Sequence, residues 1–127
     1  MERLVHIDTH VAVFLYSGQL ELFSKKILDS FENNELYISE IVRLELKYLF
    51  EIGRINTGPG EIIEGLTDEI GLKISGNTYQ RIIDKAIELN FTRDPFDRII
   101  VADAMIQDSV LVSKDRHIKK NYKNTIW

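Results

Sequence analysis

The chain has 127 residues, a formal net charge of −4 and a composition that is 44% hydrophobic and 28% charged, which is typical of one water-soluble globular domain. It contains no cysteine, which excludes disulfides, thiol catalysis and cysteine-ligated zinc and suits a cytoplasmic location. No apolar run approaches the roughly 18 residues of a membrane helix, so we expect neither a membrane span nor a signal peptide.

Short apolar runs alternate with amphipathic segments along the chain. Strands are predicted at residues 4–7, 36–38, 72–74 and 110–112, with an edge strand near 125–126. Helices are predicted at 10–16 with Thr9 as the cap, about 22–33, 39–53, 62–70, 78–86, 95–106 and from about 115, with a loop at 56–60. This alternation predicts a single three-layer α/β/α domain over residues 1–127, with a mostly parallel sheet of four to five short strands.

The segment 92–104 is the centre of the pattern. Asp94 followed by Pro95 predicts a helix start, and the helix behind them is apolar on nearly every side, as a buried crossover helix would be. Asp97 lies in its first turn on the same face as Ile100 and Ala104. It either completes a capping box or belongs to a functional site.

Three other acidic residues lie in comparable positions. Asp8 and Asp115 follow predicted strands, where open α/β sheets place their ligand crevice, although each alone could be a helix N-cap. Glu45 lies within an apolar stripe of its helix and must therefore be paired, hydrogen-bonded or bound to a metal. A buried salt bridge is the structural alternative, but no basic residue shares the Glu45 face.

Four carboxylates from separate segments would repel one another, and a divalent cation would remove that repulsion. Hard oxygen ligands suit Mg²⁺ or Mn²⁺. A zinc site formed by His6, Asp8 and His10 on one strand face is an alternative that is lost if the first helix begins at Thr9.

Several stretches resemble the PIN domain, and within it the VapC-like toxins of toxin–antitoxin pairs. They are His6-Ile-Asp-Thr-His10, Ile38-Ser-Glu-Ile with Glu45-Leu46, Arg93-Asp-Pro-Phe-Asp-Arg-Ile-Ile-Val-Ala102 and Leu111-Val-Ser-Lys-Asp115. The resemblance places the acidic quartet of the family on Asp8, Glu45, Asp97 and Asp115, with Thr9 and Ser113 as the accompanying hydroxyl residues. Asp94 is either the helix cap or a support for these ligands, and Asp103 stands where many relatives carry Gln or Ala.

The resemblance implies metal-dependent cleavage of RNA, a homodimer and inhibition by a small antitoxin protein. The segment 113–127 carries five Lys or Arg residues against Asp115 alone, so Lys114 and Arg116 are candidate RNA contacts. Phe50 lies off the Glu45 face and is either exposed for a partner or covered by the segment 59–71.

Two other function classes are left open by the sequence. The first is a PIN fold that binds or regulates without cleaving RNA, since acidic residues establish only the capacity for catalysis. The second is a phosphoaspartyl receiver or phosphatase, but the chain lacks the acid pair of a receiver, and His10 stands where such a phosphatase needs a second Asp.

Overall fold

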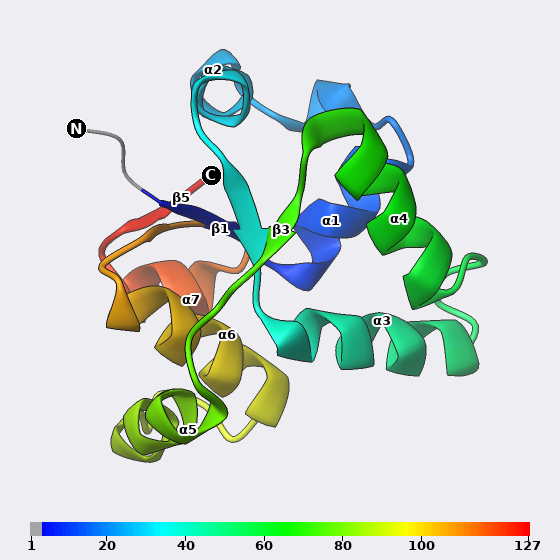
Figure 1. The fold of residues 1–127 in the computed structure, drawn as a ribbon. Coiled ribbons are helices and arrows are strands. Elements are labelled where there is room, and N and C mark those ends of the chain that lie inside the picture. Colours follow the sequence, from blue (N-terminus) through cyan, green and yellow to red (C-terminus); the bar gives the residue numbers. More distant parts are fainter. Residues whose placement is uncertain (1–3) are drawn as a thin grey trace.

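The computed structural model describes residues 4–127, and its five short strands form one sheet in the order β3-β2-β1-β4-β5 (Figure 1). Every pair of neighbouring strands is parallel, so their carboxyl ends lie along one edge of the sheet. The strands are β1 (Val5–Ile7), β2 (Leu36–Ile38), β3 (Lys73–Ile74), β4 (Val110–Val112) and β5 (Thr125–Ile126). The predicted α/β class and parallel sheet are confirmed.

Seven α-helices connect these strands within residues 4–127. They are α1 (Thr9–Tyr16), α2 (Lys25–Asn33), α3 (Glu40–Glu51), α4 (Pro59–Ile70), α5 (Tyr79–Glu88), α6 (Pro95–Ile106) and α7 (Arg116–Asn121), with a 3₁₀ turn, η1, at Leu20–Leu22. Figure 1 shows α5, α6 and α7 grouped on the opposite side of the sheet from α1 and α4. None of the helices in this range has the length and hydrophobicity that crossing a bilayer requires.

Some element boundaries differ from the prediction. The first helix begins at Thr9 and is capped by the side chain of Asp8, not by Thr9. The second begins at Lys25, because Leu22 belongs to the preceding 3₁₀ turn. Helix α4 begins inside the predicted loop, with Pro59 in the first helical turn, where a missing N–H costs nothing.

The core lies around β1 and α6. All three residues of β1 are buried, and residues 100–104 of α6 are each at most 2% exposed. This matches the nearly all-round apolar pattern of residues 96–106, which predicted a helix enclosed on most sides. The N-terminal turn of α6 extends beyond this buried stretch, where Asp94 and Pro95 are exposed.

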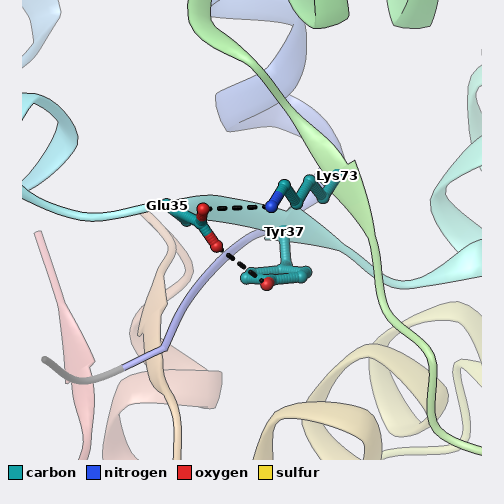
Figure 2. Close-up of polar contacts among 3 residues, drawn as sticks. All are labelled: Glu35, Tyr37 and Lys73. Carbon is teal, nitrogen blue, oxygen red and sulfur yellow. Dashed lines mark hydrogen bonds and ion pairs between the residues drawn. The ribbon is translucent and has the colours of Figure 1, made fainter.

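The edge strand β3 is tied to β2 by an exposed polar cluster (Figure 2). Lys73 Nζ lies 3.0 Å from Glu35 Oε1, and the Tyr37 hydroxyl donates to Glu35 Oε2 at 3.1 Å. The bond and charge of Lys73 hold the pKa of Glu35 below its usual range. Because these groups are exposed to solvent, this ion pair contributes little to the stability of the fold.

A buried polar cluster fixes α6 on the sheet. Asp103 is fully buried, and its Oδ1 accepts hydrogen bonds from Ser75 Oγ at 2.8 Å and Asn77 Nδ2 at 2.7 Å. The ring of His6 is also buried near Asp103 and stacks on Tyr37, and burial lowers the pKa of His6. Asp103 thus anchors the loop between β3 and α5.

Candidate functional site

A cavity of about 500 Å³ opens beside the carboxyl ends of β1 and β4, and its walls come from α1, α3, α6 and the loop before α7. The described residues that line it are Asp8, Thr9, His10, Phe14, Glu45, Asp94, Asp97, Ile100, Lys114 and Asp115. All four carboxylates of the predicted quartet are therefore brought to one cavity, together with Asp94.

Asp8 is the most enclosed of these carboxylates, at 7% exposure. It follows β1, and as the N-cap of α1 it accepts a hydrogen bond from the backbone N of Val11 at 3.0 Å. A hydrogen bond from Ser113 also reaches its carboxylate. Burial raises the pKa of Asp8, whereas these two hydrogen bonds and the nearby His10 oppose the rise. Its position is thus fixed by the first turn of α1 and by the end of β4.

Glu45 is half-buried on α3 and faces α1 across the cavity wall. The Thr9 hydroxyl donates a hydrogen bond to Glu45 Oε1, so Thr9 holds this carboxylate instead of capping its own helix. Burial raises the pKa of Glu45, Thr9 and His10 oppose the rise, and Asp94 and Asp8 reinforce it. Within residues 4–127 no salt bridge reaches Glu45, so the predicted structural alternative is not found.

The first turn of α6 separates the roles of its two acidic residues. Asp94 is the N-cap, and its Oδ1 accepts from the backbone N of Phe96 at 2.8 Å and of Asp97 at 3.3 Å. The backbone N–H of Asp94 bonds to Thr92 Oγ1, so Asp97 does not complete a capping box. Burial, followed by the charges of Asp94 and the other cavity carboxylates, raises the pKa of Asp97 to about 7.

Asp115 reaches the cavity from the loop after β4. It is the N-cap of α7 and accepts from the backbone N of His117 at 2.7 Å and of Ile118 at 3.1 Å. Its own N–H donates to Ser113 Oγ at 3.1 Å. Lys114 is the one Lys or Arg among the described residues that line the cavity, whereas Arg116 is exposed outside it.

The donor chemistry of this cavity suits Mg²⁺ or Mn²⁺, because oxygen ligands prevail. Burial and, after it, the charges of the neighbouring carboxylates raise the pKa of Asp97, and a cation would offset both effects. As the side chains of residues 4–127 lie, no three acidic or His groups are close enough to hold one ion together. The carboxylates would have to draw inward to bind it. The zinc alternative is lost, because α1 begins at Thr9 and His6 packs on Tyr37 while His10 lines the cavity.

Sequence reasoning missed Phe14, which lines the cavity beside the predicted acidic residues. The available signal is its spacing from His10, since residues four apart in a helix lie on one face. His10, a candidate zinc ligand in the sequence, also lines this cavity from α1.

Comparison with known proteins gives one family and several similar folds. The PIN domain family model matches residues 5–124. Among similar solved structures, VapBC2 from Rickettsia felis, bound to a DNA fragment from its promoter, has a TM-score of 0.68 at 16% identity, covering 97% of this chain and 96% of that one. A toxin–antitoxin complex from Klebsiella pneumoniae has a TM-score of 0.64 at 17% identity, covering 97% and 96%. VapBC-1 from nontypeable Haemophilus influenzae has a TM-score of 0.63 at 15% identity, covering 98% and 96%. No curated protein matches the sequence significantly.

Proposed function

Because this chain belongs to the PIN domain family, we propose that it is a metal-dependent endoribonuclease and the toxin of a VapBC-type toxin–antitoxin pair. The observation that carries the proposal is the convergence of Asp8, Glu45, Asp97 and Asp115 on one cavity from four separate segments. Their raised pKa values, where they occur, come from burial and mutual repulsion, as in sites adapted to a cation.

The four carboxylates are the proposed ligands of Mg²⁺ or Mn²⁺, which when bound supplies an activated water and neutralises charge on the phosphate oxygens. Asp8 is the best-held ligand, since its carboxylate is fixed by Val11 and Ser113. Thr9 orients Glu45 through its hydroxyl. Asp94 fixes the first turn of α6, and with it the position of Asp97.

Lys114 is the proposed phosphate contact, because its side chain lines the cavity among the carboxylates. It would position the RNA backbone and offset part of the negative field of the site. Arg116 would contact the backbone further out, on the exposed start of α7. Placing RNA beside five carboxylates therefore depends on both the cation and these basic side chains.

The proposed protein partners are a small antitoxin and a second copy of the chain. The similar folds from Rickettsia felis, Klebsiella pneumoniae and Haemophilus influenzae are described as toxin–antitoxin assemblies. Helix α3 and its C-cap Ile52 also expose apolar surface, with Leu44 58%, Phe50 41% and Ile52 48% exposed. Phe50 thus keeps part of its ring exposed, and this surface suits a protein partner. The cytoplasm is the proposed site of action.

Purified protein incubated with single-stranded and structured RNA tests the activity. We expect cleavage in Mn²⁺ or Mg²⁺, no cleavage in EDTA, and loss of cleavage in Asp8→Asn and in Asp97→Asn. Glu35→Gln is the matched control, since it removes one carboxylate charge from an exposed cluster outside the cavity. Full activity in both cavity variants would overturn the assignment.

The same assay distinguishes the proposed ribonuclease from the remaining alternative, a PIN fold that binds a partner without cleaving RNA. Such a module would retain RNA or protein binding while showing no metal-dependent cleavage in the wild type. The phosphoaspartyl alternatives do not stand, since the chain belongs to a different family.

A further inference from the structure

We infer that Phe14 is a positioning residue, against whose ring an unpaired nucleobase next to the cleaved phosphate packs. The inference rests on the proposed function and assigns the base contact that the acidic residues and Lys114 do not provide.

The residues that line the cavity are mostly charged or polar, with a small apolar part. Among the described residues around it, Phe14 and Ile100 are the only apolar ones, and Phe14 is the only carbocyclic aromatic. Ile100 is 2% exposed, whereas Phe14 is partly exposed and so contributes the larger apolar surface. A hydrophobic ring in a cavity of carboxylates has no role in binding a cation or a phosphate. It is suited to the flat, uncharged face of a base.

The position of Phe14 on α1 suits this role. Asp8 caps the helix, and Phe14 follows six residues later in the same helix, which places it roughly 9 Å further along the axis at 1.5 Å per residue. Both residues therefore line the same cavity, less than two helical turns apart. A phosphate held near Asp8 would thus leave a neighbouring base within reach of the ring.

The ring is also held in place before any ligand binds. Phe14 contacts Phe23, with ring centroids 6.4 Å apart, and Trp127, also at 6.4 Å. Phe23 is 6% exposed and is itself packed edge-on against Phe31 at 5.2 Å and Trp127 at 5.5 Å. An aromatic surface fixed by such a cluster loses little conformational freedom when a base stacks on it.

The expected occupant is a base, because the proposed reaction requires a phosphate in this cavity and a base is joined to that phosphate. A nucleotide joins a phosphate, which needs the cation and Lys114, to an uncharged aromatic group, which needs an apolar wall. Both surfaces line this one cavity. A paired base has its faces covered by its stacked neighbours, so the base must be unstacked where it meets Phe14.

The test combines a change of the Phe14 side chain with removal of the base that it is proposed to contact. The cleavage site of a single-stranded RNA is first mapped with the wild type in Mn²⁺, and the nucleotide on each side is then replaced by an abasic ribose. We expect one of the two abasic RNAs to lose about tenfold in kcat/KM, mostly through KM, as removal of a stacked base does. Phe14→Leu should lose a similar factor on intact RNA and nothing further on that abasic RNA.

Two further variants guard against a merely structural effect. Phe14→Tyr keeps an aromatic ring and should retain the base dependence of the wild type. Phe31→Leu alters the same aromatic cluster without touching the cavity lining, so it should destabilise the protein yet keep the wild-type ratio between intact and abasic RNA.

The inference would be overturned if the loss in kcat/KM for Phe14→Leu on abasic RNA were the product of the two separate losses. It would also be overturned if Phe14→Leu kept the wild-type KM on intact RNA. Either result would leave the proposed function standing. Base dependence lost equally in Phe31→Leu would also overturn the inference. A wild type that cleaves no RNA in Mn²⁺ would overturn the proposed function and the inference together.

Discussion

Removal of the Asp97 charge should stabilise the metal-free protein. The carboxylate of Asp97 is half-buried, and its pKa rises to about 7 because of burial and the charges of Asp94, Asp115, Glu45 and Asp8. Above pH 7 the ionised side chain therefore acts against folding, since the unfolded chain carries the same charge in water. Asp97→Asn removes the charge and keeps the shape.

The magnitude follows from the pKa. A rise from 3.8 to about 7 corresponds to about 4 kcal/mol at 1.4 kcal/mol per pKa unit, taken without screening. Because Asp97 is partly exposed, solvent reduces this figure, and we expect Asp97→Asn to gain about 1–2 kcal/mol. The cap of α6 is unaffected, because the Asp94 side chain supplies it. The corresponding rise in Tm is about 4–8 °C for a domain of this size.

Thermal melts at pH 8 measure the effect, with wild type, Asp97→Asn and Glu35→Gln compared in EDTA and in millimolar Mn²⁺. Glu35→Gln removes the same charge from a favourable ion pair and should not gain stability. Wild type should gain stability from the metal by mass action, and Asp97→Asn should lose most of that gain. If Asp97→Asn melts below wild type in EDTA, and the metal leaves wild type unchanged, the carboxylates are separate helix caps and the reasoning is refuted.

Three further predictions follow from the same structure. In EDTA the stability of the wild type relative to Asp97→Asn should rise as the pH falls from 8 to 5, because the Asp97 carboxyl, with its pKa raised to about 7, binds a proton in the native state while the unfolded chain stays ionised down to about pH 4. His6, whose pKa is lowered by burial, acts in the opposite direction in both proteins and cancels in the comparison. Urea titrations of both proteins at each pH check this, and a difference that does not change with pH contradicts it. Replacing Lys114 and Arg116 by Gln should weaken RNA binding and lower the slope of log affinity against log salt by about 1.4 for single-stranded RNA, at about 0.7 for each lost phosphate contact. An unchanged slope in filter binding places both side chains off the RNA path. Gly65→Ala should be less stable than Gly60→Ala in the same helix, because the Cβ at position 65 would lie 2.9 Å from the Tyr16 ring whereas that at position 60 meets nothing within 4 Å. The free energy of unfolding of Gly60→Ala should rise by about 0.5–1 kcal/mol. Equal urea midpoints of the two variants would show that Tyr16 moves without cost.

The architecture was predictable because its signals are local. Each short apolar run formed a strand, and the all-round apolar pattern after Pro95 formed the buried helix α6. The alternation of strands with helices then limited the topology to parallel β-α units.

Boundaries that depend on distant contacts were not predictable. Asp8 and Thr9 can each cap a helix, and the choice is made by Glu45, which lies 36 residues away and binds the Thr9 hydroxyl. Phe23 fits the apolar pattern of α2 but lies before that helix. It packs against Phe31 of α2 and also against Phe14 and Trp127, which come from opposite ends of the chain.

The acidic residues of the candidate site could be selected from the sequence, but their arrangement around the cavity could not. Carboxylates at strand ends and at a helix start are visible in the sequence, and the structure places them at one cavity. Their separations, the Thr9–Glu45 bond and the aromatic wall formed by Phe14 depend on how α1, α3 and α6 pack. No pattern within a single segment carries that information.

Restoration of RNA cleavage by added metal, in a single sample, tests the proposed metal-dependent ribonuclease activity most directly. Wild-type protein that has been stripped with EDTA and freed of chelator is mixed with RNA, and cleavage is followed before and after addition of Mn²⁺. We expect no cleavage before the metal is added, cleavage after it, and none at either stage for Asp8→Asn. Cleavage that proceeds equally without metal, or that persists in Asp8→Asn, would contradict the assignment of the acidic cavity as the active site.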